Sequence, residues 1–351
     1  MLLICYGTRP EIIKLFPLIQ SLKNNNINFK TLFTGQHYDL IQDFYFLIPK
    51  PDFMLEDIML KGQSINNLTS KIILKMEEII INNDDIKYII VQGDTTSAFA
   101  ISLCGFNNKK KIIHLEAGLR TNNKHSPFPE EANRCLISQL ADIHLTPTIN
   151  AQNNLFKENI KNNVYNVGNT IIDAYNYVIK NISMPLKIKS IIDEHKDYII
   201  VTLHRRENKG ENMIKLWNQL NQISLKYKSL KLFYIKHPSI KDLKLYLNNN
   251  IILLEPQDYI SMVYLISNCK GLISDSGGLQ EEATCANKKI LICRNTTERP
   301  ETIECKYGKL VNTDIINNIE FLFENNDFLK NNPYGNNVCE KIIKIINTIN
   351  I

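Results

Sequence analysis

The sequence predicts an α/β protein with two doubly wound, Rossmann-like domains. Short runs rich in Ile, Val and Leu alternate with helical patterns along the chain, which is typical of βαβ units around a parallel sheet. The length of 351 residues is too great for one ordinary core and suits two domains of about 150 residues each. Hydrophobic residues make up 44% of the chain and charged residues 22%, as in globular proteins.

The first half of the chain alternates strand-like and helical patterns. We expect strands at about 2–6, 29–34, 88–92, 111–115, 143–146 and 163–167. We expect helices at about 10–23, 64–82, 95–106, 130–140 and 149–158. Gly-Asn-Thr at 168–170 then breaks the alternation, so we place the first domain at 1–168.

The second half repeats this alternation after a segment that contains Pro185. We expect its strands at about 198–203, 231–235, 251–254, 271–274, 289–293 and 308–311. Asn-Pro-Tyr-Gly at 332–335 ends the last element, so the second domain spans 169–336, and a helix at 337–351 is expected to pack back on the first. In such folds we expect a ligand in a cleft between the domains, at the carboxyl ends of the strands.

Composition and charge exclude several classes of protein. The net charge is +5 with scattered basic residues, which does not indicate nucleic acid but is compatible with a small phosphorylated ligand. The apolar runs have the length of strands, so no membrane span and no signal peptide are predicted. The eight cysteines are widely spaced without a C-x-x-C pair, which predicts free thiols in a reducing, cytoplasmic compartment and no metal site.

The densest group of candidate catalytic residues lies at 114–134. Glu116 follows one predicted strand, Glu130 opens a helix after two prolines, and Asp94 follows the strand at 88–92. Carboxylates at the carboxyl ends of parallel strands lie where α/β proteins bind ligands. Three acids there, with basic residues between them, predict proton transfer next to an anionic ligand. The alternative to a catalytic role is that these residues lie in solvated loops and that the Asp is only a helix N-cap.

The first strand-to-helix turn, Gly-Thr-Arg-Pro-Glu at 7–11, has the features of an anion site. Glycine permits a tight turn, proline suits the first helical position, and free amides there favour an anion. Arg9 is a candidate phosphate clamp, and Lys14 lies about one turn further into the helix. The alternative is that both side chains only solvate the end of the helix. The G-x-G-x-x-G pattern is absent, so a dinucleotide cofactor is not predicted.

A second candidate anion site is Ser-Asp-Ser-Gly-Gly at 274–278, which follows a strand and opens a helix. Its last three residues allow a diphosphate to approach the helix amides, and Glu282, one turn further, is a candidate partner for ribose hydroxyls. An ordinary helix cap is the alternative. His204 and His237 end two other strands, and His204 stands in His-Arg-Arg-Glu-Asn, a setting that favours a functional histidine.

These motifs together resemble the non-hydrolysing UDP-N-acetylglucosamine 2-epimerases, which share the fold of GT-B glycosyltransferases. The further matching motifs include Thr-Gly-Gln-His at 34–37, Gln-Gly-Asp-Thr-Thr at 92–96, Val-Gly-Asn-Thr at 167–170, Glu-Pro-Gln-Asp-Tyr at 255–259 and Arg-Asn-Thr-Thr-Glu-Arg-Pro-Glu at 294–301. They run nearly end to end and in order, so the resemblance is specific.

The resemblance implies reversible epimerisation at C2 of UDP-N-acetylglucosamine, by elimination of UDP to 2-acetamidoglucal and re-addition, without a cofactor. It also implies a homodimer that feeds bacterial surface polysaccharide synthesis. Asp94, Glu116 and Glu130 match the acid/base set, and His204 matches a diphosphate partner that protonates the leaving group; which acid removes the C2 proton stays open. The matching substrate- or UDP-binding positions are Arg9, Lys14, His237, Gln257, Met262, Ser276, Gly277, Gly278, Glu282 and Arg299.

Two departures from the family pattern leave questions open. Met262 stands where a Phe commonly lies near the uracil, which predicts weaker stacking or a sulfur contact in its place. Gln-His-Tyr-Asp at 36–39 lacks the Arg that usually follows the His, so activation by a second UDP-N-acetylglucosamine stays open. The alternatives are a hydrolysing epimerase, an epimerase of a related UDP-sugar, a GT-B glycosyltransferase and a non-catalytic nucleotide-sugar sensor.

Overall fold

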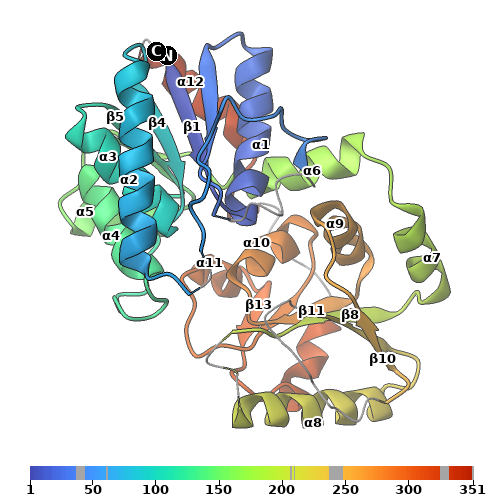
Figure 1. The fold of residues 1–351 in the computed structure, drawn as a ribbon. Helices are drawn as coiled ribbons and strands as arrows, with labels where there is room; N and C mark the ends of the chain where they lie inside the picture. The colour runs from blue at the N-terminus through green and yellow to red at the C-terminus, as the bar shows by residue number, and fades with distance from the viewer. Residues whose placement is uncertain are drawn as a thin grey trace. The chain divides into compact units, whose positions relative to one another are not determined.

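The computed structural model describes residues 1–36, 44–60, 62–205, 208, 210–236, 248–324 and 332–349. The chain forms two compact α/β units, which Figure 1 shows as a ribbon. The first unit comprises Met1–Ala174 and Tyr334–Ile351, and the second comprises Tyr175–Pro333. The chain therefore passes from one unit to the other twice.

Within the described residues, a parallel seven-stranded sheet forms the centre of the first unit, in the order β3-β2-β1-β4-β5-β6-β7. Its strands are β1 (Leu2–Tyr6), β2 (Phe29–Phe33), β3 (Phe53–Met54), β4 (Tyr88–Gln92), β5 (Lys111–Leu115), β6 (Ile143–Thr146) and β7 (Val164–Asn166). The strand order reverses between β1 and β4. The carboxyl ends of these two strands are therefore the place where a doubly wound sheet binds its ligand.

Helices cover both faces of this sheet. They are α1 (Arg9–Asn24), α2 (Ile65–Asn82), α3 (Thr96–Asn107), α4 (Glu130–Leu140), α5 (Ile149–Lys157), α6 (Ile171–Asn181, which runs on into the second unit) and α12 (Val338–Thr348). Apolar residues of α2, α3 and α4 form one core cluster with Leu3 and Cys5 of β1. The C-terminal helix α12 lies beside α1 (Figure 1). Because both faces are covered, every residue of β1 is buried, which explains its continuous apolar run.

The second unit has the same plan. Its described strands form a parallel six-stranded sheet in the order β10-β9-β8-β11-β12-β13. These strands are β8 (Tyr198–Thr202), β9 (Lys231–Ile235), β10 (Ile251–Leu254), β11 (Gly271–Ser274), β12 (Ile290–Ile292) and β13 (Gly308–Leu310). Here the order reverses between β8 and β11, so the carboxyl ends of β8 and β11 mark the expected ligand position in this unit.

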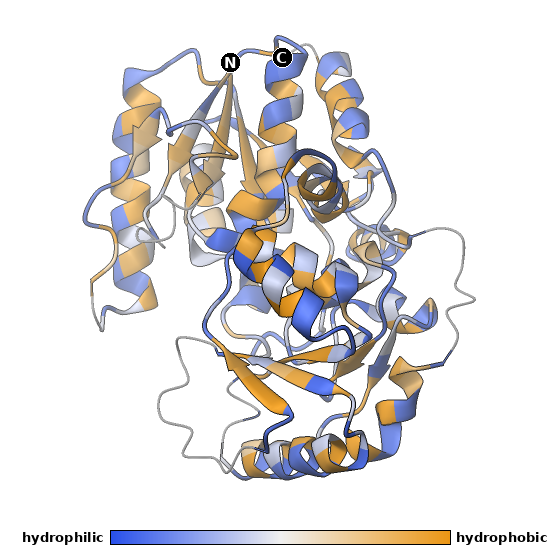
Figure 2. Cartoon of the chain, turned by 90° about the vertical axis from the view of Figure 1, so that its right-hand side faces the viewer, coloured by the Kyte–Doolittle hydropathy of each residue, from blue (hydrophilic) through white to orange (hydrophobic). Residues whose placement is uncertain are grey.

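The helices of the second unit also lie on both faces of its sheet. They are α7 (Leu186–Glu194), α8 (Glu211–Lys226), α9 (Tyr259–Asn268), α10 (Gly277–Cys285), α11 (Pro300–Glu304) and the 3₁₀ helix η4 (Ile316–Leu322). One core cluster joins α8 and η4 to the sheet, with Trp217 against Tyr234 at a ring distance of 4.7 Å. Another joins α7, α9 and α10 to the opposite face. In Figure 2 the strands are largely hydrophobic, whereas the helices have one hydrophobic and one hydrophilic side.

The predicted fold class is confirmed, and most predicted strands agree with the structure within one or two residues. The strand β3 and the helix η4 were not predicted. β3 has only two residues, too few for an alternating pattern to be recognised. Among the described residues, no helix has both the length and the apolar character needed to cross a bilayer.

Candidate active site

The three predicted acids of the first unit lie at the ends of adjacent elements. Asp94 follows β4, Glu116 follows β5, and Glu130 is the first residue of α4. β4 and β5 are hydrogen-bonded neighbours in the sheet, and β4 borders the point where the strand order reverses. The fold thus places this acid set at the edge of the first sheet where doubly wound sheets bind their ligands.

Three side chains hold the Glu116 carboxylate. Lys14 Nζ lies 2.5 Å from Glu116 Oε1, and both side chains are 8% exposed. Asn169 Nδ2 donates to the same oxygen at 3.2 Å, and Gln92 Nε2 donates to Oε2. A buried carboxylate requires such a counter-charge and hydrogen bonds. The sequence predicts no function for Gln92 or Asn169, although each lies within one of the motifs that the family shares.

The backbone around Glu116 is unusual. Glu116 has φ 68°, in the left-handed region that non-glycine residues rarely occupy. Such a conformation costs on the order of 1–3 kcal/mol and persists where surrounding contacts impose it. Two residues further on, Gly118 has φ 86°, and a Cβ there would lie 2.2 Å from the carbonyl oxygen of Ala151. Only glycine fits this turn, which explains the Glu-Ala-Gly sequence.

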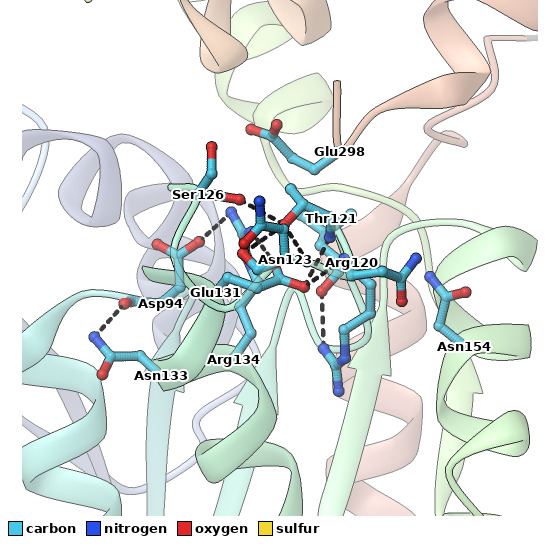
Figure 3. A network of polar contacts seen from close by, with 12 residues as sticks. Asp94, Arg120, Thr121, Asn123, Ser126, Glu131, Asn133, Arg134, Asn154 and Glu298 are labelled. Carbon is cyan, nitrogen blue, oxygen red and sulfur yellow. Dashed lines mark hydrogen bonds and ion pairs between the residues drawn. The ribbon is translucent and has the colours of Figure 1, made fainter. Parts of the chain in front are cut away.

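Asp94 is held by the helix that begins with Glu130. Arg134 Nη2 lies 2.6 Å from Asp94 Oδ2 (Figure 3). Asn133 Nδ2 donates to the main-chain oxygen of Asp94 at 2.9 Å. Glu130 itself has a buried Oε2 that finds no hydrogen-bond partner among the described residues. The three acids therefore have different surroundings: Asp94 and Glu116 each face a cation, whereas one oxygen of Glu130 has no hydrogen-bond partner among the described residues.

The prediction of free amides in the first turn was wrong. The amides of Gly7 and Thr8 donate to Glu11 Oε2 at 3.0 and 2.7 Å. Thr95 Oγ1 donates to the other oxygen of Glu11 at 2.8 Å. Glu11 occupies the third position of α1, from which a carboxylate reaches back to the N-cap amide. Burial raises the pKa of Glu11, while these hydrogen bonds act in the opposite direction.

One basic residue of the loop between Glu116 and Glu130, Arg120, does not pair with the three acids. Arg120 is buried, and its Nε and Nη2 donate to the two oxygens of Glu158 at 2.7 and 2.8 Å. Such a bidentate pair neutralises the charge of Arg120 within the protein. The cations beside the acids come instead from helices, as Lys14 of α1 and Arg134 of α4.

In the second unit, His204 and Asp275 meet at the point where the strand order reverses. His204 Nδ1 lies 3.3 Å from Asp275 Oδ1. Asp275 is 0% exposed and also accepts from the amides of His204 and Arg205, each at 2.9 Å, and from Asn208 Nδ2. Burial lowers the pKa of His204, whereas Asp275 acts to raise it, so the imidazole is neutral near pH 7. Asp275, like Gln92 and Asn169, has no predicted role, and it orients the histidine.

The N-terminus of α10 follows β11 at the same edge. Ser276 is the N-cap residue, and Gly277 and Gly278 are the first helical residues. A Cβ on Gly277 would lie 2.6 Å from Arg299 Nη1, whereas a Cβ on Gly278 would meet nothing within 4 Å. The backbone at Gly278 is therefore open to a ligand, and helix N-terminal amides favour an anion.

Arg299 is paired with two carboxylates. Its Nε donates to Glu281 Oε1 at 2.6 Å, and its Nη1 donates to Glu298 Oε1. Arg294 Nη1 donates to the other Glu298 oxygen at 2.9 Å. Arg299 thus contributes to a buried ion-pair network beside the start of α10.

The remaining predicted binding residues have simpler surroundings. Arg9 is the first residue of α1, and Glu282 is half-buried in α10. Gln257 Nε2 donates to the carbonyl of Glu255 at 2.6 Å. Met262 of α9 packs partly buried against the core of the second unit. His237 lies outside the described residues. Among the residues that are described, no group of three or more His, Cys, Asp and Glu has a metal-binding arrangement.

Two crystal structures of epimerases superpose on nearly the whole chain. The UDP-GlcNAc 2-epimerase from Neisseria meningitidis bound to UDP-GlcNAc has a TM-score of 0.90 and 34% identity, covering 99% of each chain. The Methanocaldococcus jannaschii UDP-GlcNAc 2-epimerase in complex with UDP-GlcNAc and UDP has a TM-score of 0.89 and 32% identity, again covering 99% of each chain. Fold and site together define a nucleotide-sugar enzyme of the GT-B fold.

The family follows from the sequence comparisons. The family model for UDP-N-acetylglucosamine 2-epimerase matches residues 20–347. The Campylobacter jejuni UDP-N-acetylglucosamine 2-epimerase is 40% identical over 98% of this chain and 97% of its own. The Escherichia coli K12 enzyme of the same name is 34% identical over 97% of this chain and 96% of its own. The chain belongs to the UDP-N-acetylglucosamine 2-epimerase family, as its motifs predict.

Proposed function

We propose that this protein interconverts UDP-N-acetylglucosamine and UDP-N-acetylmannosamine without hydrolysing either, as a step that supplies bacterial surface polysaccharide synthesis. The observation that carries the proposal is the 40% identity over 98% of the chain to a curated epimerase. The acids at the ends of β4 and β5 and at the start of α4 supply the chemistry that such a reaction requires.

The substrate dictates an elimination. The carbon at C2 has no adjacent carbonyl, so direct removal of its proton would leave an unstabilised carbanion. If a carboxylate takes the C2 proton while the C1–O bond breaks, the electron pair of the C2–H bond forms the C1–C2 double bond. The products are 2-acetamidoglucal and UDP. Re-addition of UDP with protonation at the other face of C2 completes the epimerisation.

The residues of the two units divide this work. Asp94, Glu116 and Glu130 are the acid–base set, because proton transfer on two faces of C2 requires more than one group. The amides at Gly277 and Gly278 oppose the charge that develops on the departing diphosphate. His204, oriented by Asp275, is assigned as the diphosphate partner that protonates the leaving group. Burial disfavours the imidazolium in the protein alone. The negative charge of a bound diphosphate favours the imidazolium, so the ring takes up a solvent proton when the nucleotide binds and gives it to the departing diphosphate.

The further binding positions follow the family motifs. Glu282 is assigned to the ribose hydroxyls and Met262 to the surroundings of the uracil. The other positions that we assign to substrate or UDP binding are Arg9, Lys14, His237, Gln257, Ser276 and Arg299. Lys14 also orients Glu116, since the two groups form a buried ion pair.

Proton NMR of UDP-N-acetylglucosamine with the enzyme in deuterated water tests the function. We expect UDP-N-acetylmannosamine with deuterium at C2 and no accumulation of free N-acetylmannosamine. Release of free sugar and UDP as the stable products would assign the chain to the hydrolysing branch. If UDP-N-acetylglucosamine stays unchanged on its own and is consumed only after an acceptor is added, the chain is a glycosyltransferase.

We further propose a cytoplasmic homodimer. All eight cysteines are free thiols, as expected of a protein that folds in a reducing compartment. Light scattering of the purified enzyme should give twice the monomer mass of 40.6 kDa, and a monomeric mass in the active enzyme would contradict this.

A further inference from the structure

The helix α4 contacts both Asp94 and the loop after β5 through one arginine and one glutamate. Arg134 lies one turn into the helix and is 5% exposed. Its Nη2 lies 2.6 Å from Asp94 Oδ2, and its Nη1 lies 2.7 Å from Glu131 Oε2. The guanidinium therefore bridges two carboxylates, one on its own helix and one on the loop that follows β4 (Figure 3).

Glu131 extends this network to the loop after β5. Its Oε1 accepts hydrogen bonds from the amides of Thr121 and Asn122 at 2.8 and 3.0 Å. Thr121 Oγ1 donates in turn to the carbonyl of Ser126 at 2.6 Å. Glu131 is 2% exposed, so it satisfies its charge through Arg134 and these two amides.

The same helix fixes the backbone of Asp94. Asn133 Nδ2 donates to the Asp94 carbonyl at 2.9 Å, so adjacent residues of α4 hold the main chain and the side chain of Asp94. α4 also begins with Glu130. One rigid helix therefore determines the positions of two acids of the proposed set.

We propose that Arg134 is a positioning residue of the epimerase reaction, which fixes the Asp94 carboxylate and is itself fixed by Glu131. This inference rests on the proposed function. A planar guanidinium has N–H groups in two fixed directions and can bind Asp94 and Glu131 together, whereas an ammonium group cannot reproduce both contacts. A misplacement of about 1 Å at a reacting group can cost about a hundredfold in rate.

A double-mutant cycle with Arg134→Lys and Asp94→Asn tests whether Arg134 acts through Asp94. We expect Arg134→Lys to lower kcat by about tenfold to a hundredfold, with the Kd for UDP within about twofold of wild type. In the Asp94→Asn background the same replacement should lower kcat by no more than about twofold, because the group that it positions is already lost. Exchange of the C2 hydrogen with deuterated solvent should follow kcat in each variant.

Arg120→Lys is the matched control. Arg120 is another buried arginine of this unit that contacts α4, through Ser138. Its side chain donates to Ser138, Glu158 and the carbonyl of Leu119, and none of these belongs to the acid set. We expect this variant to lose thermal stability while its kcat stays within about twofold of wild type. If Arg134→Lys does not fold, the cycle is made with Glu131→Gln, which keeps an oxygen for the two amides and removes the charge that orients Arg134.

Three outcomes are decisive. If the losses from Arg134→Lys and Asp94→Asn multiply, Arg134 acts independently of Asp94 and the inference is wrong. If Arg134→Lys lowers only stability or UDP affinity, the ion pair is merely structural. If the wild-type enzyme forms no epimer, the proposed function itself fails, and this is seen before any variant is compared.

Discussion

The acid stability of the first unit should depend on two histidines that its sheet buries side by side. His114 of β5 and His144 of β6 are register partners, and they are 0% and 2% exposed. His114 Nε2 shares a hydrogen bond of 2.8 Å with the carbonyl of Gly93, but the Nδ1 atoms of both rings find no partner among the described residues. Burial lowers the pKa of His114 to about 3 and that of His144 to about 4, and the nearby Arg120 adds to both shifts.

The sign and size of the effect follow from these shifts. In the unfolded chain a histidine has a pKa of about 6.5, so as the pH falls the unfolded state takes up protons first. The contribution of the two neutral histidines to the free energy of unfolding is therefore fully present above about pH 7. It is lost as the pH falls from about 6.5 to the pKa values of the folded state. At pH 5 the free energy of unfolding should fall by about 2 kcal/mol for each histidine, relative to pH 8.

Urea unfolding at pH 8 and pH 5 measures this loss. Circular dichroism follows the helices of both units, and the fluorescence of Trp217, the single tryptophan, follows the second unit alone. His144→Phe removes one titrating ring, so its stability difference between the two pH values should be about 2 kcal/mol smaller than that of wild type. Each variant is compared with itself, so a packing cost that is equal at both pH values cancels. The exposed His125→Gln serves as control and should leave the difference unchanged. An unchanged difference in His144→Phe would refute the reasoning.

The remaining predictions concern catalysis and binding. Glu116→Gln and Glu130→Gln keep the shape of the side chain but remove the proton acceptor, so steady-state turnover should fall by about a hundredfold or more while calorimetry shows unchanged UDP binding; near-normal turnover in Glu116→Gln would make that residue structural. Glu282→Ala removes only the proposed ribose contact and should weaken UDP binding by about 1–3 kcal/mol, as seen by the same titration. Turnover should survive treatment with EDTA and need no NAD, and a loss of activity that added metal restores would contradict this.

The sequence predicts the positions of the acids better than their partners. Strand periodicity locates the ends of β4 and β5, and the residues after them, Asp94 and Glu116, then follow from the topology of a parallel sheet. The turn at Gly7 shows the limit of this approach. Its glycine and proline indicate free amides for an anion, but the amides of Gly7 and Thr8 donate to the protein's own Glu11. A capping box and a ligand site have the same local pattern, and only the three-dimensional arrangement distinguishes them.

Partners that lie far apart in the chain cannot be predicted from local pattern. Asn169 stands 53 positions from Glu116, and His204 stands 71 positions from Asp275. Neither contact has a periodicity or a spacing that a single sequence displays. The motif containing Asp275 is recognisable by its glycines, because glycines at a helix start have a direct physical meaning. A buried aspartate, by contrast, acquires its role only through the amides that surround it.

One feature of the sequence does point to the partners of the acids. Lys14 and Arg134 are both buried, and both lie within the first two turns of a helix that follows a strand or its loop. The helix dipole places positive charge at this end, so a cation there gains nothing from the helix, and burial adds a desolvation cost. Such a cation is stable only if a carboxylate lies beside it. At this edge Lys14 pairs with Glu116, and Arg134 pairs with Asp94 and with Glu131 of its own helix. A basic residue about one turn after the start of a helix in a βα unit, on its buried side, therefore indicates an acid at a neighbouring strand end.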